Sequence, residues 1–552
     1  MSPKRWLLVF FSALLVVSGW AVPAGASPAP SADRQLARES VPALSPQMAW
    51  LSENPQNHGT YLIGPAAASY QPLYTGQTQG YYPITDSGAD YPALAGWLLE
   101  HCQVKHLVLA LSLTQPDSHG GSPLSLLSPP TNWQLRDVEK IGALPLYQAD
   151  HLRDFAAPPP GVQPPPVQDY SALAAQIRDL CGRYGVKLTV LLSPVFQEQW
   201  SLYSQENLRV HYASLAREVD FWDFSLTPAS CDSRYFYSSS SFRPALGAMV
   251  MARVLETEGV YHPDSFGSVV TAGTCQYYLD WLFEHPPAAD PAAYTTDVPI
   301  LLYHHVAEQV KAGDDETVVS TEAFERQMRQ LAEEGYHAVS SQELIDYVYR
   351  GTPLPEKPVY ITFDDGYYSN YSLARPILER YGMKAAIFSI GVSMGMTHYK
   401  DTGRPMVPHF GYEEARELEQ AGVADIQSHT YDMHQWAPYE TGDQIRSSIL
   451  PLEGERYADY AAALLADLAV YDQKRTQELG RGFAALAYPG GEYSSWTEAL
   501  VHQAGIPLTL STSTDRRNVL VKGLPQSLYA LCRWYVTEDT TPEQLRAILQ
   551  GP

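Results

Sequence analysis

Short apolar runs alternate with longer amphipathic stretches along this chain, and this alternation restricts the folds that it can adopt. The apolar runs have the length of single strands, whereas the stretches between them have the length and spacing of helices. Apolar runs lie at 61–63, 106–111, 187–192, 298–303 and 359–363, and helical stretches lie at 170–183, 321–334 and 341–349. Alternating strands and helices favour a mostly parallel sheet, so we predict an α/β fold.

A stretch rich in Pro and Ala divides the chain into two parts. Helices and strands both tolerate its sequence, Pro286-Pro287-Ala288-Ala289-Asp290-Pro291, poorly. A chain of 552 residues is also too long for a single hydrophobic core. We therefore predict a first domain at 45–285, a linker at 286–296 and a second domain at 297–552.

The first residues are typical of a signal peptide. Lys4 and Arg5 precede an apolar run that ends near Trp20, and Ala24-Gly25-Ala26 offers a cleavage site. We predict a signal peptide at 1–26 and a flexible leader at 27–44, and hence a secreted or cell-surface protein. The apolar run is shorter than the roughly 20 residues of a membrane span, although an uncleaved anchor is an alternative. We expect no stable membrane span in the mature form.

Composition limits the partners of this protein. With 45% hydrophobic and 18% charged residues, the chain has the composition of a globular protein. Its net charge of -24 argues against nucleic acid as a partner, since phosphate polymers are bound through clustered Lys and Arg. The five cysteines lack any C-x-x-C spacing and leave both disulfides and buried thiols open. No feature predicts an oligomeric state.

Three pieces of the first domain resemble SGNH-hydrolase-like domains of exported polysaccharide-modifying proteins. They lie at 190–194, 221–225 and 238–244, the last directly before a helix. The resemblance implies a nucleophilic Ser near the first strand and an Asp and a His before the last helix. Ser69 stands near the first of these places, but Ser238 and Ser241 occupy the other two. We predict a non-catalytic domain that binds sugar or acts as a scaffold, with an active esterase as the alternative.

Two acidic residues follow a strand in the second domain. The apolar run at 359–363 leads directly into Asp364-Asp365-Gly366. Asp and Gly both favour turns, and a turn is the simplest interpretation. In parallel α/β folds, however, functional groups gather at the C-terminal ends of strands. Neighbouring side chains there point in different directions, so one carboxylate can bind a metal while the other faces a water.

Two histidines at a later strand end favour the metal interpretation. His429 follows Asp425-Ile426-Gln427-Ser428, and His434 lies five residues further on. Two imidazoles and one carboxylate leave the open coordination position that a hydrolytic metal requires. Histidines alone are weak evidence, but their combination with the acidic pair predicts a metal site.

A third element, Tyr488-Pro489-Gly490, ends a further strand. Together with the acidic pair and the two histidines, it resembles the ordered motifs of the NodB-type polysaccharide deacetylase family. The resemblance covers about 297–549, and the spacing of the histidines is similar to the branch that includes exported poly-N-acetylglucosamine deacetylases. It implies a distorted (β/α) barrel.

The resemblance also implies a role for each matched residue. Asp365, His429 and His434 are expected to bind Zn2+ or another divalent transition metal, and Asp364 is expected to act as the general base. A backbone N–H near Tyr488 is expected to stabilise the oxyanion. The implied activity is removal of N-acetyl groups from an acetylated polysaccharide, either peptidoglycan or an exopolysaccharide. The alternatives are an O-acetyl esterase and a non-catalytic glycan-binding protein.

The sequence departs from the family pattern at two positions. Ala485 stands where many members carry an Arg that orients the base, and no histidine follows His502 to act as a late general acid. Arg533 is a candidate for the orienting role, and a solvated surface Arg is the other interpretation. The general acid stays open between His304, His305, His409 and a metal-bound water.

Overall fold

The computed structural model describes residues 48, 51, 59–70, 80–85, 90–113, 166–239, 241–442, 444–514 and 516–551. The predicted signal peptide and leader lie outside these residues. Within them, no helix combines the length and apolar character that crossing a membrane requires. None of the five cysteines, all of which are described, forms a disulfide.

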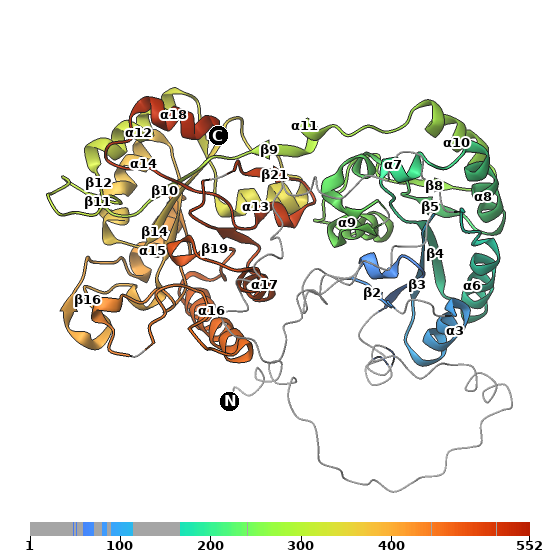
Figure 1. Ribbon diagram of the computed structural model, residues 1–552, viewed down its shortest axis with the longest axis horizontal. Coiled ribbons are helices and arrows are strands. Elements are labelled where there is room, and N and C mark those ends of the chain that lie inside the picture. Colours follow the sequence, from blue (N-terminus) through green and yellow to red (C-terminus); the bar gives the residue numbers. More distant parts are fainter. Residues whose placement is uncertain are drawn as a thin grey trace, which may run out of the picture.

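The first domain contains a six-stranded sheet in the order β2-β1-β3-β4-β5-β8 (Figure 1). Its strands are β1 (Thr60–Ile63), β2 (Tyr82–Pro83), β3 (His106–Leu111), β4 (Lys187–Leu192), β5 (Phe221–Asp223) and β8 (Ser268–Val270). Neighbouring strands are parallel except for β8, which runs antiparallel to β5. The predicted mostly parallel sheet is therefore confirmed here.

Helices cover both faces of this sheet (Figure 1). The helices are α3 (Tyr91–His101), α6 (Ser171–Tyr184), α7 (Gln197–Trp200), α8 (Gln205–Glu218), α9 (Pro244–Leu255) and α10 (Cys275–Glu284), with short turns η1 (Ala67–Tyr70), η3 (Pro228–Cys231) and η4 (Ser233–Tyr235). Helices α3, α6, α8 and α10 share one core, whereas η1 and α9 belong to a second core.

The two serines before α9 lie in a hairpin of β6 (Phe236–Ser238) and β7 (Ser241–Phe242), where Ser238 pairs with Ser241. Ser69 lies in η1, and its carbonyl lies close to Gly247 of α9. A mostly parallel sheet with helices on both faces does not by itself identify an SGNH hydrolase. The resemblance of this domain to SGNH hydrolases therefore stays a prediction.

The segment predicted as a linker contains a short helix and a strand. Helix α11 (Pro291–Tyr294) leads into β9 (Thr295–Asp297), which pairs antiparallel with β21 (Val519–Val521). The Tyr294 hydroxyl donates to the Asp232 carboxylate at 2.7 Å, and the Tyr235 hydroxyl donates to the Lys522 carbonyl at 2.8 Å. Val521 and Leu524 belong to the same buried cluster as α9. The two domains are therefore in direct contact.

The second domain is built on an eight-stranded parallel sheet in the order β20-β19-β18-β15-β14-β10-β22, with β13 beside β14. Its strands are β10 (Ile300–Tyr303), β13 (His337–Ala338), β14 (Pro358–Asp365), β15 (Ala385–Ser389), β18 (Ala424–Ser428), β19 (Ala485–Ala487), β20 (Leu508–Leu510) and β22 (Trp534–Tyr535). A bridge between Leu510 and Leu531 joins β20 to the segment that enters β22. The two ends of the sheet thus approach each other, consistent with the predicted distorted barrel.

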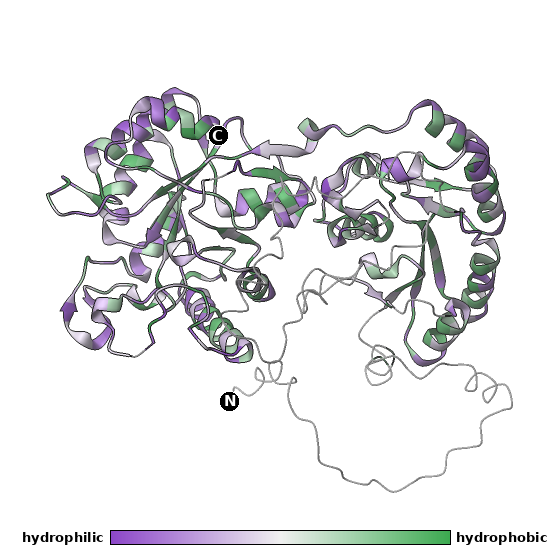
Figure 2. Ribbon diagram, in the orientation of Figure 1, coloured by the Kyte–Doolittle hydropathy of each residue, from purple (hydrophilic) through white to green (hydrophobic). Residues whose placement is uncertain are grey.

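Helices surround this sheet, and Figure 2 shows apolar residues along its strands and polar ones on the outer helices. They are α12 (Thr321–Glu333), α13 (Ser341–Arg350), η5 (Asn370–Ala374), α14 (Arg375–Tyr381), α15 (Tyr412–Gln420), α16 (Tyr457–Leu479), α17 (Ser495–Gln503) and α18 (Pro542–Gln550). Helix α13 shows how the sequence sets such elements. Ser340 and Glu343 form a capping box at its start, and Gly351 ends it in the left-handed conformation.

Short elements connect the main ones. They are β11 (Val306–Ala307), β12 (Val319–Ser320), η6 (Gly391–Ser393), β16 (His398–Tyr399), η7 (Lys400–Thr402), β17 (Arg404–Pro405), η8 (Ala437–Tyr439), η9 (Pro489–Gly491) and η10 (Pro525–Leu528). Strands β16 and β17 form a hairpin between β15 and α15.

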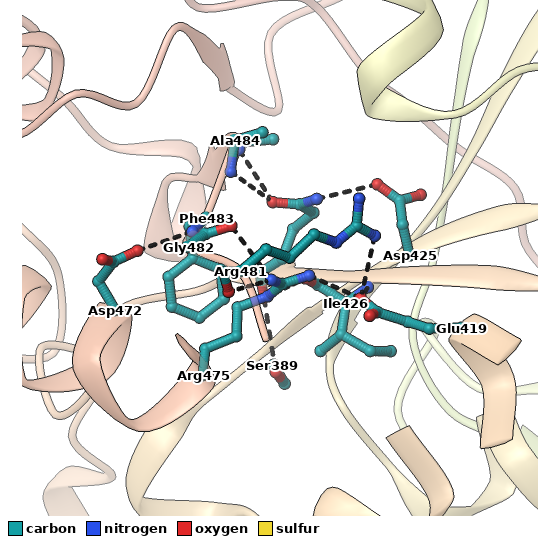
Figure 3. A network of polar contacts seen from close by, with 12 residues as sticks. Ser389, Glu419, Asp425, Ile426, Asp472, Arg475, Arg481, Gly482, Phe483 and Ala484 are labelled. Carbon is teal, nitrogen blue, oxygen red and sulfur yellow. Dashed lines mark hydrogen bonds and ion pairs between the residues drawn. The ribbon is translucent and has the colours of Figure 1, made fainter. Parts of the chain in front are cut away.

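A buried polar network fixes the end of β18 (Figure 3). Arg475 of α16 is 1% exposed, donates to the Ile426 carbonyl at 2.9 Å and pairs with Glu419 at 2.6 Å. The side-chain oxygen of Gln427 accepts the N–H groups of Ala484 and Ala485. These bonds join β18 to α16 and β19 directly before the chain reaches His429.

Candidate functional site

Two successive carboxylates end β14. Asp364 is almost completely buried, and Asp365 has a left-handed backbone with a φ of 70°. Gly366 follows with a φ of 86°, and a Cβ at this position would lie 2.8 Å from the Cβ of Ser389. A glycine is therefore required at this turn. The turn sends the two carboxylates toward different partners.

Asp365, His429 and His434 come together as the predicted metal ligands. Their ligand atoms all lie within 4.8 Å of one another. Asp365 Oδ1 lies 3.7 Å from His429 Nε2 and 3.8 Å from His434 Nε2. This oxygen is buried and has no hydrogen-bond partner within the described part of the chain. A buried carboxylate oxygen that faces two imidazole nitrogens fits a divalent transition metal ion.

Backbone carbonyls set the tautomer of both histidines. His429 Nδ1 donates to the Ala487 carbonyl at 2.8 Å, and His434 Nδ1 donates to the Ser447 carbonyl at 3.0 Å. Since a carbonyl only accepts, each Nδ1 carries the hydrogen and each Nε2 presents its lone pair. Burial lowers the pKa of His429 to about 4, so this ring is neutral near pH 7. Sequence reasoning missed both carbonyls, because a backbone acceptor leaves no mark on residue identity.

Asp364 is held by Arg533. The guanidinium donates to both carboxylate oxygens, with Nη1–Oδ1 at 2.6 Å and Nη2–Oδ2 at 2.7 Å, and Nε donates to the Ser511 carbonyl at 3.0 Å. Burial has the largest single effect on the pKa of Asp364 and would raise it, but the charge and hydrogen bonds of Arg533, together with the nearby His429 and His304, lower that pKa to about 2. Arg533 is completely buried. The interpretation of Arg533 as a solvated surface residue is therefore wrong.

Tyr488 directly follows Ala487, whose carbonyl accepts the hydrogen bond of His429. Its ring is buried and stacks on Tyr493 with centroids 4.9 Å apart, and its hydroxyl has no hydrogen-bond partner among the described residues. Its own N–H donates to the Leu510 carbonyl at 2.9 Å and is already used in the sheet. Pro489 has no N–H, so the first N–H after Tyr488 belongs to Gly490. If a backbone N–H next to Tyr488 stabilises the oxyanion, as expected, it is therefore the N–H of Gly490.

Of the three histidines considered as general acid, His304 and His409 lie close enough to Asp365 to interact with its charge, and His305 contacts Tyr367. The ring of His304 is stacked parallel to Tyr535 with centroids 5.8 Å apart, and its buried Nδ1 has no hydrogen-bond partner in the described chain. The rings of His305 and His409 pack against the ring of Tyr367, with centroid distances of 5.2 and 4.9 Å. Their Nδ1 atoms bond to the Ser369 hydroxyl and the Val407 carbonyl. Only His304 therefore has a buried nitrogen that is uncommitted.

Sequence reasoning missed Tyr367 and Tyr535, which hold these histidines. The negative charge of Asp365, followed by burial, raises the pKa of Tyr367 well above its usual value. Tyr367 directly follows the Asp-Asp-Gly turn, and this position in the sequence could have indicated that it lies at the site.

Replacing His434 with Ala is expected to weaken Zn2+ binding by more than about 100-fold. Loss of a residue that only supports a metal ligand already lowers affinity by up to about 100-fold, and loss of the ligand itself should cost more. Isothermal titration of the full chain measures this affinity. His398→Ala is a matched control, because His398 is exposed on β16 and does not belong to the ligand group. Equal affinity of the His434 variant and the wild type would exclude this residue as a ligand.

Comparison with known proteins finds similarity to polysaccharide deacetylases. A family profile described as polysaccharide deacetylase matches residues 351–509. The chain is 29% identical over 254 residues to a Bacillus subtilis protein named "Putative polysaccharide deacetylase YxkH", covering 46% of this chain and 76% of that protein. It is 30% identical over 173 residues to poly-beta-1,6-N-acetyl-D-glucosamine N-deacetylase of Escherichia coli K12, covering 29% of this chain but only 24% of that protein. The solved structure of IcaB from Ammonifex degensii, at 25% identity and a TM-score of 0.37, covers 46% of this chain and 97% of that one.

Proposed function

We propose that this protein, whose residues 351–509 match the polysaccharide deacetylase family, is a secreted, metal-dependent N-deacetylase. Its substrate is a polymer of N-acetylhexosamine, either peptidoglycan or an exopolysaccharide. The observation that carries this proposal is the arrangement of Asp364 and Asp365. One carboxylate faces two imidazole lone pairs, while its neighbour is kept ionised by a buried guanidinium.

Asp365, His429 and His434 would hold Zn2+ or another divalent transition metal. When bound, such an ion supplies Lewis-acid polarisation of the acetyl carbonyl and of the attacking water. Asp364 takes the proton from that water, and its pKa of about 2 keeps it ionised at physiological pH. Arg533 orients the carboxylate through two hydrogen bonds, and the N–H of Gly490 is the candidate donor to the oxyanion.

We assign the general acid to His304. The acid must deliver a proton to the amide nitrogen as the bond between carbon and nitrogen breaks, so that acetate and a free amine leave. His304 follows β10, which neighbours β14 in the sheet, and its buried Nδ1 is uncommitted. His305 and His409 bond through Nδ1 to the Ser369 hydroxyl and the Val407 carbonyl, so in each of them only Nε2 remains to act as the acid.

Replacing His304 with Gln is expected to lower kcat by about 10²- to 10³-fold, because an amine is a poor leaving group without a proton donor. Metal affinity should stay unchanged. The matched variant is His409→Gln, which alters another histidine that interacts with the charge of Asp365. A large loss in the His409 variant with a small loss in the His304 variant would move the acid role to His409.

The proposed function is tested by acetate release from N-acetylglucosamine oligomers, peptidoglycan and an O-acetylated glycan. Release from the N-acetylated substrates that a chelator abolishes and added Zn2+ restores is the expected result. Release from the O-acetylated glycan alone would establish an O-acetyl esterase. A folded, metal-loaded protein that releases no acetate from any substrate would leave glycan binding as its function.

A further inference from the structure

The loop between the two histidine ligands, residues 430–433, is held by a carboxylate from a distant helix. We propose that Asp467 of α16 is a positioning residue that sets the affinity of the metal site by fixing this loop. The proposal rests on the proposed function, because it takes Asp365, His429 and His434 as the metal ligands.

Both oxygens of Asp467 accept hydrogen bonds from this loop. Oδ2 accepts the N–H of Tyr431 and Oδ1 accepts the N–H of Asp432, each at 2.8 Å. Two neighbouring N–H donors that point at one group require two acceptors, which an ionised carboxylate provides. These bonds join the middle of the loop to the same helix that carries Arg475.

The loop has a backbone that needs such support. Thr430 adopts a left-handed φ of 69°, which is uncommon for a β-branched residue. Its side chain accepts the N–H of Met433 at 3.2 Å, and its carbonyl accepts the N–H of Gly391 at 3.0 Å. A residue in a sparsely populated conformation persists only where its surroundings hold it there.

The two ends of the loop are fixed to different degrees. His429 is almost fully buried and directly follows β18, which is held by Arg475 and Gln427. His434 has a side chain that is 32% exposed, and its Nδ1 bonds only to the Ser447 carbonyl among the described residues. Release of the loop should therefore displace His434 from Asp365 more readily than it displaces His429.

The loop also has a tether on its outer side. Lys400 Nζ lies 2.7 Å from Asp432 Oδ1 and 2.6 Å from Glu440 Oε1. This ion pair is partly exposed, and such pairs contribute little when solvent screens them. Asp467 is the stronger of the two restraints, because its bonds go to backbone N–H groups.

The Asp467 carboxylate is partly removed from water, which makes its charged form less favourable. Burial raises the pKa of this carboxyl to about 6, even though its two N–H partners favour the charged form. A neutral side chain would avoid the cost of burying a charge. The presence of a buried carboxylate here, bonded to two N–H groups of the loop, is consistent with a role in arranging the loop.

The test compares Zn2+ dissociation constants of the full chain by competition with a chromophoric chelator. Asp467→Ala is expected to bind Zn2+ about 10- to 100-fold more weakly, the usual effect of removing a residue that supports a metal ligand. Asp467→Asn, which keeps one acceptor, should give a smaller loss. Asp472→Asn is the matched control, because Asp472 lies on the same helix and accepts the N–H of Phe483, away from the loop (Figure 3). Its Zn2+ affinity should equal that of the wild type.

Hydrogen exchange supplies the second readout. The amides of Tyr431 and Asp432 should exchange faster in Asp467→Ala, while amides of β18 stay protected. Unchanged Zn2+ affinity in folded Asp467→Ala, or in Asp467→Asn if the alanine variant does not fold, would overturn the proposal. Equal losses in the Asp467 and Asp472 variants would also overturn it, since they would reflect general damage to α16. These measurements need no turnover, so a wild type that binds Zn2+ but releases no acetate would count against the proposed function alone.

Discussion

Replacing Asp364 with Asn is expected to reduce kcat/KM for acetate release by about 10³-fold or more, within the upper range for loss of a general base. The amide keeps the shape of the side chain but cannot take a proton from water. Affinity for Zn2+ should change little, because Asp365 and not Asp364 faces both imidazole nitrogens. Initial rates of acetate release and a Zn2+ titration of the same preparation measure the two effects.

A control for this variant needs another carboxylate on the same sheet. Asp425 of β18 is suitable, because burial raises its pKa and its side chain accepts a hydrogen bond from Gln427 rather than from Arg533. Asp425→Asn should retain wild-type kcat/KM. Substantial activity in Asp364→Asn with bound metal would show that another group accepts the proton.

The sequence alone predicted the acidic pair and both histidines, because each lies at a strand end within a short local motif. It named Arg533 as a candidate to orient Asp364 but could not decide between that role and a solvated surface position, since Arg533 lies 169 positions away and reaches Asp364 only through the sheet. The same limit applies to the segment predicted as a linker. Strand β9 pairs with β21, more than 200 residues further along the chain, and no local pattern encodes that choice of partner.

The two departures from the family pattern have one structural explanation. Strand β10 lies between β22 and β14 in the sheet. Arg533 directly precedes β22, and His304 directly follows β10, so both reach the acidic pair from the same side. His429 comes from the other side, after β18. We propose that these two residues, from β10 and from the segment before β22, take the roles expected near Ala485 and after His502, which motif order alone does not reveal.

Replacing Arg533 with Met is expected to affect both stability and activity. Removing one partner of a buried ion pair leaves the other charge uncompensated, which typically costs about 3–5 kcal/mol. The Asp364 carboxylate is buried and keeps two oxygens that have lost their charged donors. It would also lose the orientation that serves the base, so kcat/KM should fall by at least about 10²-fold. Urea denaturation and acetate release measure the two effects.

The pH dependence of stability separates this electrostatic effect from a loss of packing. In the wild type the pKa of Asp364 is lowered from 3.8 to about 2, so its contribution is complete above pH 3.8 and is lost as the pH falls toward 2. Without Arg533 burial raises that pKa, and the folded variant favours the protonated acid. The stability gap between wild type and Arg533→Met should therefore shrink as the pH falls from 7 to 4. Arg533→Lys keeps the charge but not the planar fork and should lie between the two. A gap that stays constant over this range would indicate that Arg533 contributes through packing rather than through its charge.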